Sequence, residues 1–136
     1  MKRFYTMALL AFSLCFLPSC KDSPEKVLED AADFQNDISD ALEQFERGEI
    51  SIDEAREVFL ERYEKFHALS DRWEALSEEQ GVAIDELIAE ADEDGELSNE
   101  TGKAAMRIRE VFKRMNMRHD VPDFFKQEMT NFYNGN

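Results

Sequence analysis

Apolar residues recur at every third or fourth position along most of the chain, which is the period of an amphipathic α-helix. Ser23 and Pro24 stand where an N-cap and a first-turn proline would begin a first helix, and Gly48 stands where that helix would end. Large phenylalanines alternate with small alanines on its apolar face, as interlocking helices require. This face consists of Val27, Leu28, Ala31, Phe34, Ile38, Ala41, Leu42 and Phe45.

A second helix is predicted to follow the capping-box sequence of residues 51–54. Phe59, Phe66 and Trp73 recur at intervals of seven residues along its apolar face, with Arg62 in the middle. Both predicted helices are about 24 residues long and a short turn joins them, which indicates an antiparallel hairpin. Residues 77–80 repeat the capping signature, so we expect a third helix to start there or the second to kink.

Further apolar stripes predict two more helices and a short terminal one. The third helix is expected to end in an acidic segment around Gly95, and the fourth is expected to have Ser98 or Asn99 as its N-cap. Residues 120–123 are expected to begin a short C-terminal helix. No stretch shows the sustained alternation of a strand. The sequence therefore predicts an all-α fold. We expect an antiparallel bundle of about four main helices plus a short C-terminal helix, as a single domain of residues 24–136.

The start of the chain is typical of a secretory signal. Lys2 and Arg3 are followed by an apolar stretch over residues 4–17. As a helix, this stretch would span about 21 Å, which is short of the ~30 Å hydrocarbon core of a membrane. A cleaved signal peptide of residues 1–19 is therefore expected rather than a membrane-spanning anchor.

The residues that follow, Leu17-Pro18-Ser19-Cys20, resemble the lipobox of bacterial lipoproteins. The resemblance implies cleavage before Cys20, a diacylglycerol on its thiol and an acyl chain, such as palmitate, on its amine. It also implies sorting to the outer membrane, because Lys21 is not the aspartate that retains such proteins in the inner membrane. Residues 20–23 are then a short tether, and the protein is expected to be lipid-anchored in a bacterial cell envelope and to face the periplasm.

Charge limits the possible partners. The 136 residues include 31 acidic and 16 basic side chains, a net charge of −15, which argues against nucleic acid as a partner. Residues 21–100 carry a net charge of −20 and residues 101–136 a net charge of +3. A basic stripe on the fourth helix and an aromatic C-terminal tail are the predicted partner-binding residues: Lys103, Arg107, Arg114, Arg118, Phe124, Phe125 and Phe132. The alternatives are that the stripe offsets the charge of acidic neighbours and that the tail covers the core.

Residues 90–101 are a candidate calcium loop, with Asp92, Asp94 and Glu96 as oxygen ligands around Gly95. The loop departs from the EF-hand pattern at both coordinating ends, because Glu90 is first and Thr101 is twelfth. An acidic loop that ends a helix is the alternative.

Other chemistry is sparse. His67 and His119 each lack a second histidine at helical spacing, so no zinc or haem site is predicted. Arg62 is expected to meet an acid of the first helix such as Asp37, or to extend outward, unless Tyr63 takes the inward place. Without a phosphate loop, a nucleophile motif or a cysteine after Cys20, the sequence indicates no enzyme and no cofactor.

The sequence thus favours a non-catalytic adaptor that binds another envelope component. One alternative is a calcium-binding module that uses the acidic loop. The other is a carrier of a small hydrophobic ligand in a cavity among Phe34, Phe59, Phe66 and Trp73.

Overall fold

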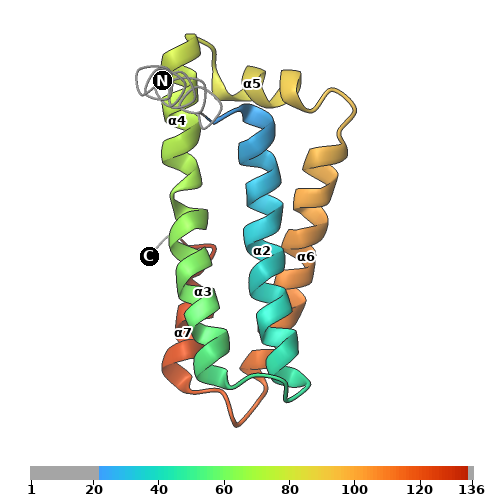
Figure 1. Ribbon diagram of the computed structural model, residues 1–136, viewed down its shortest axis with the longest axis vertical. Coiled ribbons are helices and arrows are strands. Elements are labelled where there is room, and N and C mark those ends of the chain that lie inside the picture. Colours follow the sequence, from blue (N-terminus) through green and yellow to red (C-terminus); the bar gives the residue numbers. More distant parts are fainter. Residues whose placement is uncertain (1–21, 135–136) are drawn as a thin grey trace, which may run out of the picture.

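The described part of the chain, residues 22–134, is helical and contains no strand in the computed structural model (Figure 1). Its helices are α2 (Pro24–Glu46), α3 (Ile52–His67), α4 (Leu69–Gln80), α5 (Ile84–Ala91), α6 (Glu96–Asn116) and α7 (Asp123–Asn131). The predicted all-α bundle is confirmed. The expected signal peptide and Cys20 lie outside the described residues. None of the helices between residues 22 and 134 is long and apolar enough to cross a membrane.

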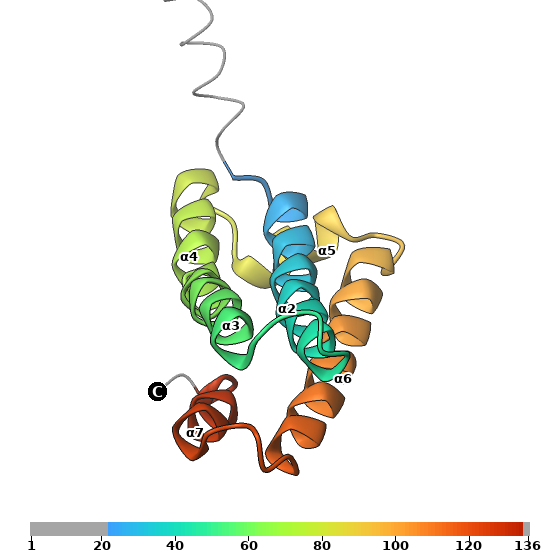
Figure 2. The ribbon, with the colours of Figure 1, turned by 60° about the horizontal axis from the view of Figure 1, so that its bottom comes forward.

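Helix α2 lies in the middle of the bundle (Figures 1 and 2). The line formed by α3 and α4 packs on one side of α2 and runs antiparallel to it, and α6 packs on the other side and runs in the same direction as α2. Short α5 crosses one end of the bundle, whereas α7 packs at the other end. The predicted hairpin of the first two helices is confirmed. The expected third helix proves to be this short crossing segment.

Local signals explain where α2 and α3 begin. The Ser23 hydroxyl accepts a hydrogen bond from the Lys26 backbone N–H at 3.2 Å, and Pro24 occupies the first turn. At α3, the Ser51 hydroxyl accepts from the Glu54 N–H and the Glu54 carboxylate accepts from the Ser51 N–H, each at 3.1 Å. This reciprocal pair confirms the predicted capping box.

The expectation that a helix starts at the second capping signature is wrong. Residues 77–80 are the last turn of α4, and the Ser77 hydroxyl donates to the Val82 carbonyl at 2.7 Å instead of capping a new helix. Gly81 ends the helix at φ +66°, a left-handed conformation that glycine adopts without strain. The line of helices is interrupted earlier, at Ala68, where α3 ends and α4 begins.

Two apolar clusters form the core. The first lies where α2, α3, α6 and α7 meet and includes Ile38, Leu42, Phe59, Ile108, Met115, Phe125 and Phe132. The second lies towards the α5 end and includes Val27, Leu69, Leu76 and Leu87. Because α2 is covered on two sides, it also buries polar side chains, among them Gln35 and Ser39. The Gln35 amide oxygen accepts a hydrogen bond from the Tyr133 hydroxyl at 2.8 Å, which ties the chain after α7 to the centre of α2.

Candidate functional site

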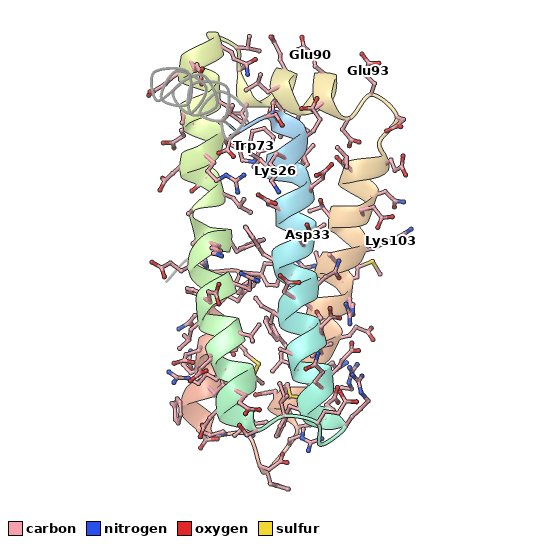
Figure 3. The ribbon with its side chains drawn as sticks, in the orientation of Figure 1. Lys26, Asp33, Trp73, Glu90, Glu93 and Lys103 are labelled. Carbon is pink, nitrogen blue, oxygen red and sulfur yellow. The ribbon has the colours of Figure 1, made fainter. Side chains whose placement is uncertain are left out.

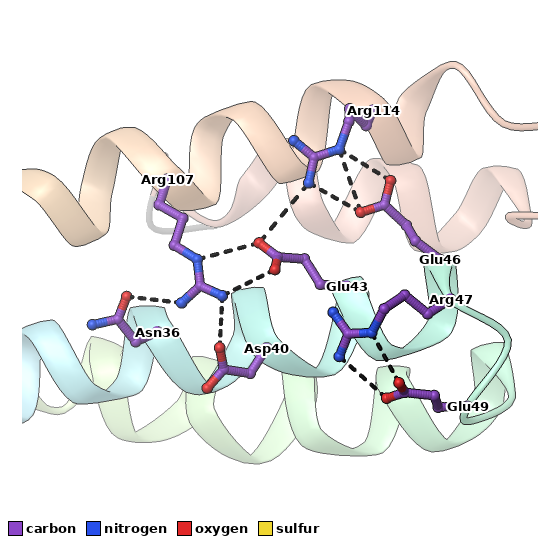
Figure 4. Close-up of polar contacts among 8 residues, drawn as sticks. All are labelled: Asn36, Asp40, Glu43, Glu46, Arg47, Glu49, Arg107 and Arg114. Carbon is purple, nitrogen blue, oxygen red and sulfur yellow. Dashed lines mark hydrogen bonds and ion pairs between the residues drawn. The ribbon is translucent and has the colours of Figure 1, made fainter.

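The predicted basic stripe begins with Arg107, whose guanidinium is held by α2. Its Nη2 lies 2.6 Å from Asp40 Oδ1, its Nε lies 3.2 Å from Glu43 Oε1, and its Nη1 lies 3.2 Å from Asn36 Oδ1 (Figure 4). These contacts use most of the donors that an external anion would need.

Arg114 repeats this arrangement two turns further along. Its Nε and Nη2 each donate to the Glu46 carboxylate at 3.0 Å, and Glu43 lies 3.9 Å from its Nη2 (Figure 4). Hydrogen bonding to Glu46 raises the pKa of the Arg114 guanidinium. The alternative interpretation of the stripe, neutralisation of acidic neighbours, therefore describes both Arg107 and Arg114.

The two ends of the stripe are different. Lys103 is exposed, points away from the bundle in Figure 3, and has Glu100 at 3.5 Å on its own helix. Arg118 pairs with Asp120 at 2.7 Å, and its guanidinium lies 4.9 Å from the centre of the Phe45 ring. The predicted stripe is thus occupied largely by contacts within the chain.

The aromatic tail is divided between core and surface. Phe125 and Phe132 are fully buried against Phe59, with ring centres 5.2 and 6.1 Å away, so these two residues cover the core. Phe124 is 56% exposed, and the Arg56 guanidinium lies over its ring at 4.9 Å. Only Phe124 of the predicted aromatic residues is available to a partner.

The carboxylates of the acidic loop accept hydrogen bonds from backbone N–H groups at the start of α6. Asp92 accepts from the backbone N–H groups of Leu97 and Ser98 at 2.8 and 2.9 Å, and Asp94 accepts from Glu96 N–H at 3.0 Å. Hydrogen bonding from Ser98 lowers the pKa of Asp92 despite the opposing effect of its burial. Helix α6 consequently begins at Glu96, and the expected N-cap at residue 98 or 99 is wrong. Gly95 precedes it at φ +74°.

No group of three or more His, Cys, Asp or Glu side chains that could hold a metal ion occurs within residues 22–134. At the α5 end, Glu90 and Glu93 project outward rather than toward a shared centre (Figure 3).

The four rings of the proposed ligand cavity belong to two regions of the core. Phe59 is in the first cluster, Phe34 and Trp73 pack against the second, and Phe66 touches both. Phe66 stacks on Phe132 with ring centres 4.7 Å apart. Phe59 and Trp73 therefore belong to different clusters of the core, and Phe66 connects the two.

A groove of about 240 Å³ between α6 and α7 was not predicted. Its basic lining residues are Arg109, Lys113 and Lys126, accompanied by Phe112, Asn116, Met129 and Thr130. Every other Lys and Arg among residues 22–134 forms an ion pair with a carboxylate. The cations that no carboxylate of the described chain neutralises are thus brought together in one place.

The spacing of two basic residues in the sequence indicates part of this groove. Arg109 and Lys113 are four residues apart and so share a face of α6, opposite the flank that holds Arg107 and Arg114. Both flanks are basic, and only the packing of α2 decides which flank meets carboxylates. Arg109 also lies over the Tyr133 ring at 4.9 Å, and burial raises the pKa of the Tyr133 hydroxyl to about 12.

Comparison of the chain with protein-family models, with curated proteins and with solved structures found no match.

Proposed function

We propose that the protein is a lipid-anchored, non-catalytic adaptor that binds another component of a bacterial cell envelope. Cys20 would carry the anchor in the outer membrane, and the helical domain would face the periplasm. The basic and apolar start of the chain and the lipobox-like residues 17–20 support export and anchoring. A net charge of −15 argues against nucleic acid as the bound component.

The observation that carries this proposal is the α6–α7 groove. Arg109, Lys113 and Lys126 have no carboxylate partner among residues 22–134, although carboxylates are abundant in the chain. Cations that form no ion pair with a carboxylate can form charge-assisted contacts with a partner without first losing a salt bridge. We therefore assign partner binding to this groove rather than to the predicted stripe.

The test is photo-crosslinking of the full-length, lipidated protein in its native envelope, with a photoreactive amino acid at position 116 on the groove. Position 106 is the control, since Met106 is 69% exposed and lies outside the groove. The proposal expects a discrete crosslinked species at position 116 that is lost in Lys113→Glu. Equal crosslinking at both positions, or none at either, would contradict it. Intact-mass analysis tests the anchor, with diacylglycerol on Cys20 as the expected result.

A further inference from the structure

We infer that the α6–α7 groove recognises an acidic, extended segment of a protein partner, with carboxylates at alternate positions along that segment. The inference rests on the proposed adaptor function and names the chemistry by which the groove would select its partner. It follows from the free charges, their spacing, the remaining lining and the place of the groove in the bundle.

The cations of the groove that form no ion pair favour a negatively charged ligand. An anion that entered between Arg109, Lys113 and Lys126 would meet cations with no ion pair to break. An anion at Arg107 would instead have to displace Asp40 and the neighbouring Glu43. At physiological salt the Debye length is about 8 Å, so charges of the chain that lie farther than this from the groove are largely screened.

The spacing of the cations favours an extended peptide over a compact anion. Arg109 and Lys113 are separated by four residues of α6, which corresponds to about 6 Å along the helix axis. Side chains at alternate positions of an extended chain are about 6.6 Å apart on one face. Two carboxylates separated by one residue therefore match these two cations, and Lys126 adds a third positive charge from α7.

The rest of the lining fits a peptide as well. Phe112 is half-buried, so the accessible part of its ring offers apolar surface to the side chains of a bound segment. Asn116 is exposed on α6, where its amide can hydrogen-bond a peptide backbone. An inorganic anion would gain nothing from the apolar part of the groove.

The place of the groove separates it from the anchoring membrane. Helix α2 begins at Pro24, only four residues after Cys20, and starts near α5. The groove lies along the last third of α6 and along α7, toward the opposite end of the bundle (Figures 1 and 2). Glu90 and Glu93 project from the α5 end, where they would repel anionic headgroups (Figure 3). This arrangement directs the groove toward a protein partner rather than toward the lipids that hold the anchor.

Fluorescence anisotropy tests the inference directly. The full-length lipidated protein, in an uncharged detergent, is titrated against a labelled peptide with glutamate at alternate positions, and against the same peptide with glutamine instead. We expect the glutamate peptide to bind at least tenfold more tightly, and Lys113→Glu and Lys126→Glu each to weaken it by about tenfold. Lys103→Glu makes the same change of charge on α6 outside the groove, so its affinity should stay within twofold of the parent protein.

Other results would overturn the inference. Equal binding of both peptides, or the same loss in Lys103→Glu as in Lys113→Glu, would remove the acidic segment as the ligand. Binding of phosphatidylglycerol vesicles through Lys113 without peptide binding would assign the groove to lipid. If the peptides fail while the crosslink at position 116 still depends on Lys113, the ligand class is wrong and the adaptor function stands. If the crosslink is also independent of Lys113, both proposals fail.

Discussion

The guanidinium of Arg62 on α3 donates to the carboxylate of Asp37 on α2, with 2.8 Å between Nε and Oδ2. The pair joins the two helices of the hairpin and keeps the charge of Arg62 out of the apolar core. Its side chains are 27% and 41% exposed, so water screens the attraction between them. The expectation that Arg62 meets an acid of the first helix is confirmed.

A double-mutant cycle measures this pair. Because the contact is partly exposed, the coupling between Arg62→Met and Asp37→Asn should be below about 1 kcal/mol in the free energy of unfolding. Urea denaturation of the parent protein, the two single variants and the double variant provides the value. A coupling of several kcal/mol would mean that the pair is shielded from water more completely than the structure shows.

Phe124 and Phe125 are neighbours in α7 with opposite surroundings. Phe125 is fully buried against Phe59, whereas Phe124 is 56% exposed. Phe125→Ala should lower the free energy of unfolding by about 3–5 kcal/mol, because it removes packing and leaves a cavity. Phe124→Ala should cost less than about 1 kcal/mol, because it removes an exposed ring and its cation–π contact with Arg56.

Thermal unfolding of the two variants, followed by circular dichroism, tests the assignment of the tail. A larger loss in Phe124→Ala than in Phe125→Ala would contradict the orientation of α7.

The helix pattern was predictable because each long helix buries a face whose spacing is visible in the sequence. Ser51 and Glu54 marked the start of α3 correctly, since a capping box is a local interaction. Ser77 led to a wrong prediction of a helix start because a capping signature reports only local sequence. Its signature is local, but the helix continues because Leu76 is buried in the second cluster, and Gly81 ends it.

The groove was not predictable because it depends on contacts between helices. Arg107 and Arg109 are of the same type and only two positions apart, yet one is held by Asp40 and the other lines the groove. Sequence periodicity shows that they lie on different flanks of α6, but not which flank α2 covers. That choice follows from α5, which crosses the end of the bundle and returns the chain so that α6 runs beside α2.

Asp30 should contribute to the pH dependence of stability. Its burial alone would raise its pKa, but hydrogen bonds from Lys26 and Arg72, each at 2.9 Å, hold the pKa of the Asp30 carboxyl below its ordinary value of 3.8. The folded state therefore binds this proton less readily than the unfolded state. The stabilisation is present above about pH 4 and is lost as the pH falls through the lowered pKa.

Asp30→Asn should therefore reduce the free energy of unfolding at pH 7 and make its decline below pH 4 shallower than in the parent protein. Asp33→Asn is the matched control, since Asp33 is an exposed carboxylate on the same helix (Figure 3). Urea unfolding between pH 2 and pH 7 gives both slopes, with the pH range set by the lowered pKa of Asp30. An identical acid profile for Asp30→Asn and the parent protein would refute the role of Asp30.

Asp92 should act as a helix cap. Its carboxylate accepts hydrogen bonds from two backbone N–H groups at the start of α6. Asp92→Ala should therefore lower the free energy of unfolding by about 0.5–2 kcal/mol. Glu93→Ala, at the exposed neighbouring position, is the control and should cost less. We expect millimolar calcium to leave the unfolding midpoint of the parent protein unchanged, because Asp92 is already engaged. A rise of the midpoint with calcium that disappears in Asp92→Ala would support the calcium hypothesis instead.

Tyr133 offers a spectroscopic test of how the chain after α7 is held. Burial raises the pKa of its hydroxyl to about 12, above the ordinary value of 10.0, although Arg109 opposes the shift. The absorbance at about 295 nm, taken as the difference between the parent protein and Tyr133→Phe, should therefore titrate near pH 12. The unfolded state releases this proton at lower pH, so stability should fall as the pH rises from about 10 toward 12. A titration of Tyr133 near pH 10 in protein that circular dichroism shows to be folded would mean that the hydroxyl is open to solvent and that its bond to Gln35 is absent.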